Sequence, residues 1–300
     1  MKALVTGATG FVGSHVAGRL AADNHVVHAL IRRSSNRELL AGIQGNVEFH
    51  VIDGSRTYLA DLIKAISPDV VFHTASMFLA DHRSEDVRDL IESNIAFPCE
   101  LVEAMVRNDT LRLVNCSSSW QHYQDSPYDP VCLYAATKQA FIDLLKYYVG
   151  AKGLAVIDLT LFDTYGPRDR RPKLFSALYR AAEGGQEIAF SPGEQLIDLV
   201  YIDDVVNAIV LAADRLMRDR RGRLESYAVS GDNAMRLRDV VQVFTQVTGV
   251  QPDVAWGRRL YRSREMMRPW TGGTRLPEWR AVVDLADGIR RMHESHVQDP

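Results

Sequence analysis

The sequence predicts an α/β protein in which helices cover both faces of a doubly wound parallel sheet. Short runs rich in Val, Ile and Leu alternate with longer segments of helical spacing over the first half of the chain. This alternation is typical of βαβ units around a parallel sheet. The runs are apolar on both faces, as strands between two helical layers are. A glycine-rich turn also joins the first run to the first helical segment.

The individual elements follow from these patterns. Strands are expected where a run has the length and β-branched content of a buried strand, at 2–6, 25–31, 47–52, 70–73, 111–116 and 154–161. Helices are expected where apolar residues recur at helical spacing between these runs, at about 11–22, 56–66, 86–107 and 133–150.

Beyond Gly166 the pattern becomes irregular, because Pro and Gly interrupt it repeatedly. Helical spacing returns at about 174–183, 203–217 and 235–249. We therefore expect a nucleotide-binding domain at 1–165 and a smaller, mixed substrate-binding region at 166–300. Parts of about 196–230 are expected to return to the first domain.

Composition and charge exclude several classes of protein. The 300 residues are 46% hydrophobic, too apolar for a disordered chain, yet no window approaches the roughly 18 apolar residues of a membrane span. With 35 basic and 38 acidic residues, the net charge of −3 gives no case for nucleic acid as a partner. No histidine spacing predicts a metal site. We expect a cytoplasmic protein without a signal peptide, whose three cysteines are reduced: Cys99, Cys116 and Cys132.

The glycine-rich turn has the spacing GxxGxxG and follows the first strand directly. Glycines allow a tight turn, close approach of a pyrophosphate to the backbone, and close packing of helix on sheet. The free amides and the dipole of the helix that follows attract phosphates. We therefore expect this turn to bind a dinucleotide through Gly7, Thr9, Gly10, Phe11, Val12 and Gly13.

The end of the second strand indicates which dinucleotide binds. NAD-binding proteins of this type carry an acidic residue there that holds the ribose hydroxyls, whereas this chain has Arg32, Arg33 and Ser34. Guanidinium and hydroxyl groups suit a 2′-phosphate. NADP(H) is therefore favoured, with NAD(H) as the alternative if the two arginines are merely solvated.

Tyr134 and Lys138 are four residues apart, so a helix places them on one face. A phenol has an ordinary pKa of about 10, and a fixed ammonium together with an oxidised nicotinamide is expected to lower it. We expect this pair to be catalytic and to contact the cofactor.

The combination of GxxGxxG with Tyr134 and Lys138 resembles the extended short-chain dehydrogenases/reductases of the NAD-dependent epimerase/dehydratase type. The likeness covers nearly the whole chain, with further matching pieces at 71–76, 164–167 and 201–205 and at Asn94. It implies a Rossmann-type domain and an enzyme that acts on nucleotide sugars. It also implies a homodimer formed through helices at about 86–107 and 133–150.

The resemblance also implies roles for particular residues. The stretch from Ser117 to Tyr123 resembles the segment that carries the family's catalytic hydroxyl, which falls on Ser119, with Ser118 as the fallback. His73 is expected to be a packed structural histidine and Asn94 to brace the sheet. Further cofactor contacts are expected from Asp53, Gly54, Thr74, Ala75, Ser76, Phe162 and Thr164.

Departures from the family pattern narrow the reaction. The sequence at 119–121 is Ser-Trp-Gln, so it lacks the Asp/Glu pair of the dehydratases and the Glu of the decarboxylases. A ketoreductase or a C4 epimerase remains, and the strand-end arginines favour net reduction with NADPH. Several segments also look like the CDP-abequose and CDP-paratose synthase branch, which implies reduction of an NDP-4-keto-6-deoxyhexose at C4. A dinucleotide-sensing regulator without catalysis is a third hypothesis, which the intact Tyr134 and Lys138 oppose.

Substrate contacts are the least specific expectation. Many relatives have Arg-Asp where this chain reads Ile197-Asp198, so the diphosphate needs another basic partner. The candidates are Lys173, Arg168 and the arginines between 258 and 268, although a solvated face explains most of that arginine cluster equally well. The residues expected to contact the sugar nucleotide are Ser118, Ser119, Trp120, Gln121, Asp163, Arg168 and Lys173.

Overall fold

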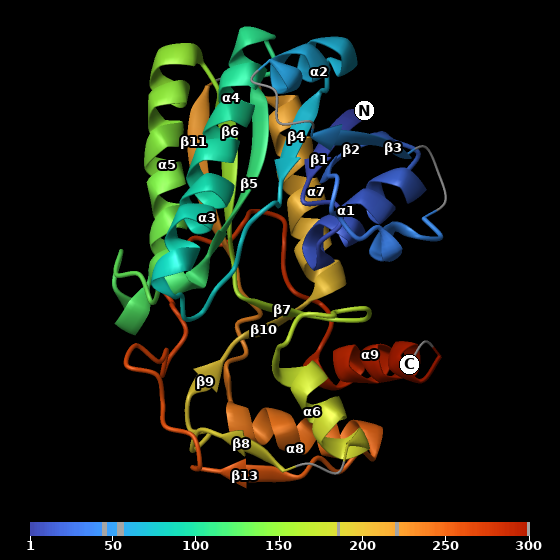
Figure 1. Ribbon diagram of the computed structural model, residues 1–300, viewed down its shortest axis with the longest axis vertical. Helices are drawn as coiled ribbons and strands as arrows, with labels where there is room; N and C mark the ends of the chain where they lie inside the picture. The colour runs from blue at the N-terminus through green and yellow to red at the C-terminus, as the bar shows by residue number, and fades with distance from the viewer. Residues whose placement is uncertain (44–46, 53–56, 185–186, 220–221, 299–300) are drawn as a thin grey trace.

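A parallel sheet of seven strands forms the centre of the protein (Figure 1). The computed structural model describes residues 1–43, 47–52, 57–184, 187–219 and 222–298. In spatial order the strands are β11 (Arg223–Val229), β6 (Ala155–Leu161), β5 (Arg112–Ser118), β4 (Val70–His73), β1 (Lys2–Thr6), β2 (Val26–Arg32) and β3 (Val47–Ile52). All neighbouring strands are parallel, which confirms the predicted fold class.

Helices cover both faces of this sheet because successive strand residues point to opposite sides. Ala3 and Val5 of β1 belong to a core shared with α1 (Phe11–Ala22) and α7 (Ile202–Arg218). Leu4 belongs to a second core on the other face. That face is covered by α2 (Tyr58–Ile66), α4 (Phe97–Arg107) and α5 (Leu133–Lys152). No helix in the described part of the chain is long and apolar enough to cross a membrane.

The continuous helix predicted at 86–107 is instead divided into four pieces. A 3₁₀ turn, η2 (Ser84–Asp86), leads into α3 (Val87–Ile91), a π-helical turn η3 (Glu92–Ala96) and then α4. The prediction failed here because spacing of apolar residues does not reveal a π turn. Such turns are frequent at functional sites, and this one contains Asn94.

The C-terminal part lies below the sheet in Figure 1 and consists of three helices and small two-stranded sheets. The helices are α6 (Leu174–Glu183), α8 (Leu237–Thr248) and α9 (Leu285–Gln298). The paired strands are β7 (Asp163–Tyr165) with β10 (Leu199–Tyr201), β8 (Ile188–Phe190) with β13 (Val254–Trp256), and β9 (Leu196–Ile197) with β12 (Met235–Arg236).

The chain crosses between the two parts more than once. After β10, α7 packs against α1 and the central strands, and β11 then pairs in parallel with β6. Three short 3₁₀ segments lie in loops around the site, namely η1 (Glu38–Leu40), η4 (Ser119–Gln121) and η5 (Tyr123–Asp125). These loops are at the carboxyl end of the sheet, where α/β proteins bind ligands.

Candidate active site

The glycine-rich turn between β1 and α1 is too tightly packed for a side chain at two of its positions. Gly7 has a φ of +69°, and a Cβ there would lie 2.6 Å from the amide nitrogen of Ala75. A Cβ on Gly13 would lie 2.1 Å from the Gly7 carbonyl oxygen, which already accepts a 2.9 Å hydrogen bond from the Gly10 amide. Bare backbone therefore borders the start of α1, as a pyrophosphate cradle requires.

The loop after β4 forms the opposite wall of this turn. Thr74 Oγ1 donates a 2.7 Å hydrogen bond to the Thr6 carbonyl, so the segment 74–76 lies beside Gly7. His73 is buried and its Nδ1 lies 2.9 Å from Thr6 Oγ1. Burial lowers the pKa of His73 to about 3, which keeps this packed imidazole neutral. Phe162, which follows β6, and Thr164 of β7 are also buried.

The end of β2 presents free cationic groups. Arg32, Arg33 and Ser34 are exposed, and no described residue forms an ion pair with either guanidinium. The Arg32 backbone is fixed, because its amide donates to Ser35 Oγ at 3.0 Å. Asp53 and Gly54, expected to contact the adenine side of the cofactor, lie outside the described residues.

The segment after β7 brings more arginines to this end of the sheet. Arg171, which the sequence analysis missed, lies 4.5 Å from the centre of the Phe11 ring and is bidentate to Asp169. Arg168 donates to the Glu38 carbonyl at 3.1 Å, and Arg170 pairs with the Glu38 carboxylate. The structure thus places Arg168 against η1, on the cofactor side, rather than among the residues around Tyr134 where a sugar contact was expected.

Tyr134 and Lys138 lie one turn apart at the start of α5, as predicted from their spacing. Lys138 Nζ donates a 2.9 Å hydrogen bond to the Cys116 carbonyl and lies 5.9 Å from the centre of the Tyr134 ring. Burial raises the pKa of Tyr134 to about 12, although hydrogen bonding with the Ser118 and Ser76 hydroxyls acts in the opposite direction. The phenol of the protein alone is therefore protonated near neutral pH and available as a proton donor.

A buried carboxylate near Lys138 was not anticipated. Asp158 of β6 accepts hydrogen bonds from Asn115 Nδ2 (2.6 Å) and Ser117 Oγ (2.7 Å). Burial raises the pKa of Asp158 to about 6, while these hydrogen bonds and the Lys138 charge oppose the rise. Burial also lowers the pKa of Lys138, which the Asp158 charge counteracts. A charged residue inside an otherwise apolar strand run was the signal in the sequence.

The hydroxyls of Ser118 and Ser76, and not that of Ser119, are the side-chain groups that lower the pKa of Tyr134 against the effect of burial. The chain enters η4 at Ser119, which is 5% exposed, and its hydroxyl makes no hydrogen bond to a described residue. Ser118 lies at the end of β5, where its Oγ accepts from the Trp120 amide at 3.3 Å. The fallback residue of the sequence analysis therefore occupies the position beside the phenol.

Asn94 fixes the loop after β4 to the helix that carries the catalytic pair. Its Nδ2 donates to the Met77 carbonyl (2.9 Å) and to Thr137 Oγ1 (3.0 Å), and its Oδ1 accepts from the Met77 amide (2.8 Å). Thr137 is the neighbour of Lys138. The π turn of η3 thus holds Asn94 where it braces this loop rather than the sheet itself.

An aromatic and basic wall lies next to Tyr134. Phe78, another residue that the sequence analysis missed, contacts the Tyr134 ring edge to face, with ring centres 5.0 Å apart. It makes the same kind of contact with Trp120 at 5.4 Å. Lys173 lies 5.6 Å from the Phe78 ring and 3.4 Å from Asp163, and Arg262 lies 5.7 Å from the Trp120 ring. Two expected substrate contacts, Trp120 and Lys173, therefore contact one exposed phenylalanine, and Asp163 and Arg262 contact those two residues in turn.

Gln121 does not belong to this wall. It is 2% exposed, its Oε1 accepts from the Ser118 amide (3.0 Å), and its Nε2 donates to Gln139 (2.9 Å). Both ends of the amide are used to hold the turn after β5. Gln121 is thus engaged with protein groups in this structure, and its contact with the sugar stays a prediction.

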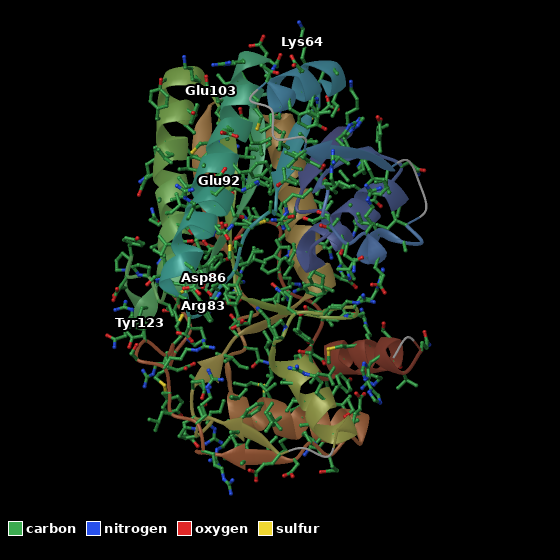
Figure 2. The ribbon with its side chains drawn as sticks, in the orientation of Figure 1. Lys64, Arg83, Asp86, Glu92, Glu103 and Tyr123 are labelled. Carbon is green, nitrogen blue, oxygen red and sulfur yellow. The ribbon has the colours of Figure 1, made fainter. Side chains whose placement is uncertain are left out.

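The segment after β13 crosses back over the loop 119–131. Arg264 lies 4.3 Å from the Tyr123 ring and pairs with Asp129, and the Trp270 ring stacks on His122 at 3.6 Å. Figure 2 shows Tyr123 near Arg83 and Asp86, which precede α3, at the lower end of the helices that cover the sheet. By contrast, Arg258 pairs with Glu187 at 2.9 Å, away from the site.

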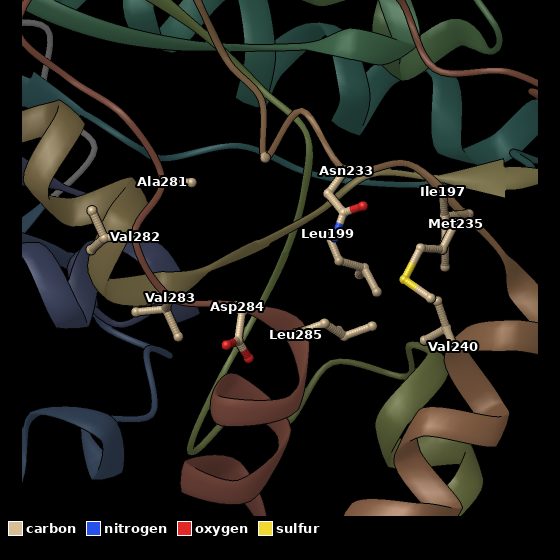
Figure 3. Close-up of a pocket in the computed structure, with 11 residues that line it drawn as sticks. Ile197, Leu199, Asn233, Met235, Val240, Ala281, Val282, Val283, Asp284 and Leu285 are labelled. Carbon is tan, nitrogen blue, oxygen red and sulfur yellow. The ribbon is translucent and has the colours of Figure 1, made fainter.

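A separate cavity of about 210 Å³ lies in the C-terminal part (Figure 3). Most of the residues that line it are apolar, and they include Ile197 and Leu199, the residues on either side of Asp198. Asp198 points elsewhere, because it accepts hydrogen bonds from Ser230 Oγ (2.5 Å) and the Gly231 amide (2.9 Å). The cavity therefore contains no basic group that replaces the arginine of the relatives.

Comparison with known proteins shows which family and which proteins this chain resembles. The sequence pattern of the NAD dependent epimerase/dehydratase family matches residues 3–228. CDP-abequose synthase of Yersinia pseudotuberculosis is 26% identical over 274 residues, which cover 90% of this chain and 92% of that protein. UDP-glucose 4-epimerase of Mycolicibacterium smegmatis is 30% identical over 230 residues, or 71% and 73% of the two chains.

Solved structures show the same fold over the full length. UDP-glucose 4-epimerase from Stenotrophomonas maltophila, with bound NAD and formylated UDP-arabinopyranose, matches with a TM-score of 0.88 at 21% identity. The alignment covers 99% of this chain and 98% of the other. UDP-glucose 4-epimerase from Thermotoga maritima, with UDP-glucose, matches with a TM-score of 0.87 at 21% identity and covers 99% of both chains.

Proposed function

Because the chain belongs to the NAD dependent epimerase/dehydratase family, we propose that it reduces the C4 keto group of an NDP-4-keto-6-deoxyhexose with NADPH. The observation that carries this proposal is the pair of exposed guanidinium groups at the end of β2, Arg32 and Arg33. A 2′-phosphate between them would be held by charge-assisted hydrogen bonds. Net reduction needs a reduced cofactor that exchanges with solution, and NADPH is the usual donor for it.

The residues around Tyr134 suit this chemistry. The reduced nicotinamide supplies the hydride when the cofactor is bound. The Tyr134 phenol, protonated at neutral pH because its pKa is raised to about 12, donates the proton that the developing alkoxide needs. Ser118 binds the same oxygen and orients it. Lys138, fixed by the Cys116 carbonyl, contributes the positive charge that favours loss of the phenolic proton, and is expected to hold the nicotinamide ribose.

The sugar side of the site supports a simple transfer of hydride and proton. The turn after β5 carries Trp120 and the buried Gln121 where a dehydratase needs an acid and a base. Phe78, Trp120 and Lys173 are therefore proposed to contact the sugar, with Arg262 as the basic partner of the diphosphate. The similarity to CDP-abequose synthase over 90% of the chain agrees with this substrate class.

The test is turnover of a panel of nucleotide sugars. Purified protein is mixed with NADPH and a CDP- or dTDP-linked 4-keto-6-deoxyhexose, and absorbance of the reduced nicotinamide is followed. Consumption of NADPH with formation of the 4-hydroxy sugar is expected. A strong preference for NADH, or no turnover with any such sugar, rejects the proposal.

An NAD-dependent C4 epimerase is the second candidate. It is favoured by the 30% identity to a UDP-glucose 4-epimerase and by the fold shared with an epimerase that binds NAD. An epimerase returns the hydride to its substrate and gains by retaining its cofactor. Stoichiometric NAD in the purified protein, with interconversion of UDP-glucose and UDP-galactose, would favour it over the reductase.

We also propose that the protein forms a homodimer through α3 to α5, the helices expected from the sequence. Two large apolar side chains on α5, Leu144 and Tyr147, are 40% and 60% exposed, and Ile91 of α3 is 41% exposed. Exposed apolar side chains on neighbouring helices are typical of a protein interface. Light scattering of the wild type and of Leu144→Glu would separate a dimer from a monomer.

A further inference from the structure

Three side chains with metal-ligating atoms converge on one face of the central sheet, away from the glycine turn. His28 belongs to β2, and Glu48 and His50 belong to the edge strand β3. Residues two apart on a strand share a face, which places Glu48 beside His50. The register then pairs His28 directly with Glu48. Figure 1 shows β2 and β3 next to each other at this edge of the sheet.

The ligating atoms lie at the distances that a small metal ion requires. His28 Nδ1 is 2.9 Å from His50 Nε2, and the Glu48 carboxylate oxygens are 3.5 Å from His28 Nδ1 and 3.8 Å from His50 Nε2. Ligands of a tetrahedral zinc ion with bonds of about 2.0–2.1 Å lie about 3.3 Å apart. One of the three observed separations is shorter than this value and two are longer. Movements of the side chains by a few tenths of an ångström would therefore bring the ligand atoms to the distances of a zinc site.

Metal binding also needs free lone pairs and a favourable charge. An imidazole binds a metal ion through the lone pair of an unprotonated ring nitrogen. At 2.9 Å one of the two facing nitrogens carries a hydrogen atom. Metal binding requires a lone pair on both, so that hydrogen moves to the far nitrogen of its ring and no proton is released. Glu48 supplies a negative charge, and Lys2 is the nearby cation that opposes it.

We propose that His28, Glu48 and His50 form a binding site for a divalent transition-metal ion, with Zn²⁺ as the best fit and water as the fourth ligand. Two imidazoles and one carboxylate favour Zn²⁺, Ni²⁺ or Co²⁺ over Mg²⁺ and Ca²⁺, which prefer oxygen ligands. His28 and Glu48 lie in the first half of their strands, whereas the glycine turn follows the last residue of β1. The ion would therefore be structural and would take no part in hydride transfer.

The location gives such an ion a specific mechanical effect. β3 is an edge strand and pairs only with β2 within the sheet that the structure describes. An ion held by His28 on one strand and by Glu48 and His50 on the other would clamp β3 to β2. Because the ion binds the folded state, it would raise thermal stability in proportion to the logarithm of its concentration.

The test uses the full-length protein after chelation and removal of metal. Co²⁺ is titrated as a spectroscopic probe, because tetrahedral Co²⁺ gives a visible absorption band, and Zn²⁺ is then added to displace it. One equivalent of Co²⁺ with this band, its loss on adding Zn²⁺, and a higher melting temperature with Zn²⁺ are expected. Absence of saturable binding at one equivalent would overturn the proposal.

Three variants show whether these residues form the site. His50→Gln and Glu48→Gln should each weaken Zn²⁺ binding by at least about tenfold. The Glu48 side chain is 63% exposed, so Glu48→Gln tests the site with the least disturbance of the fold. His82→Gln removes an exposed histidine elsewhere and should bind as the wild type does. If Glu48→Gln keeps wild-type affinity, or if His82→Gln loses as much as His50→Gln, the ion binds elsewhere and the proposal is wrong.

Discussion

Gly13 approaches Gly7 so closely that a Cβ on Gly13 would lie 2.1 Å from the Gly7 carbonyl oxygen. Gly13→Ala should therefore destabilise the protein by about 1–3 kcal/mol and weaken NADPH binding, because the turn must open. Gly18 on the same helix is the matched control, since its Cβ would meet Ile43 at an ordinary 3.7 Å. Gly18→Ala should raise the free energy of unfolding by up to about 1 kcal/mol. Urea unfolding and fluorescence titration with NADPH measure both effects, and wild-type cofactor affinity in Gly13→Ala would contradict the packing argument.

Tyr134→Phe removes the proposed proton donor and leaves the ring contact with Phe78 in place. Loss of a general acid should lower kcat by about 10²–10⁴-fold with little effect on the free energy of unfolding. Tyr147→Phe changes a 60% exposed phenol on the same helix and should keep wild-type kcat. Activity of Tyr134→Phe within a few-fold of the wild type would show that another group donates the proton, and retained biological function without turnover would point to a regulator.

The elements that could be predicted from the sequence are those whose own residues carry the signal. β1 and α1 have their predicted bounds, because a buried strand and a packed helix each need the apolar pattern that these segments show. β11 was missed because its sequence, RLESYAV, begins with polar residues, and its pairing with β6 makes it a strand. α9 was missed because only Gly288, Ile289 and Met292 of its residues are buried.

The residues of the site also fall into two groups, those that the sequence predicts and those that it does not. Tyr134 and Lys138 could be found because four residues is one helical turn, and the glycines because backbone contact forbids a side chain. Phe78 and Arg171 could not be found, since their roles depend on loops that fold over the sheet from distant parts of the chain. The strand predicted to end at Cys116 continues to Ser118, so Ser118 is its last residue and η4 begins at Ser119.

Arg32→Ala tests the preference for NADPH. Loss of a charge-assisted hydrogen bond costs about 1.5–3 kcal/mol, so kcat/KM for NADPH should fall by about 10- to 100-fold, while kcat/KM for NADH should hardly change. Arg107→Ala, which removes an exposed guanidinium paired with Glu103 on α4, should leave both values unchanged. Equal losses with the two cofactors would mean that Arg32 does not contact a 2′-phosphate.

Ser118→Ala and Ser119→Ala decide which hydroxyl binds the reacting oxygen. Removing one hydrogen-bond donor from the developing oxyanion typically costs about 10²-fold in kcat, and the structure assigns that loss to Ser118. Ser119→Ala should stay within about tenfold of the wild type, because Ser119 is not among the side chains that shift the pKa of the Tyr134 phenol. The comparison requires steady-state kinetics of both variants, and the opposite ranking would return the role to Ser119.

Asp158→Asn tests the buried carboxylate through the pH dependence of stability. Burial raises the pKa of Asp158 to about 6 in the folded protein, against about 3.9 when unfolded. Between these two values the folded state holds a proton that the unfolded state has lost, so the wild type loses stability as pH rises through this window. The variant has no such group, and groups shared by both proteins cancel in their difference. Between about pH 4.5 and pH 7 the free energy of unfolding of Asp158→Asn, taken relative to that of the wild type, should therefore increase by about 2 kcal/mol.

Asp143→Asn is the control for this measurement, because Asp143 is exposed on α5. Its free energy of unfolding relative to the wild type, measured in urea at the same two pH values, should change far less. A constant difference between Asp158→Asn and the wild type would mean that the Lys138 ammonium and the two hydrogen bonds keep Asp158 ionised throughout.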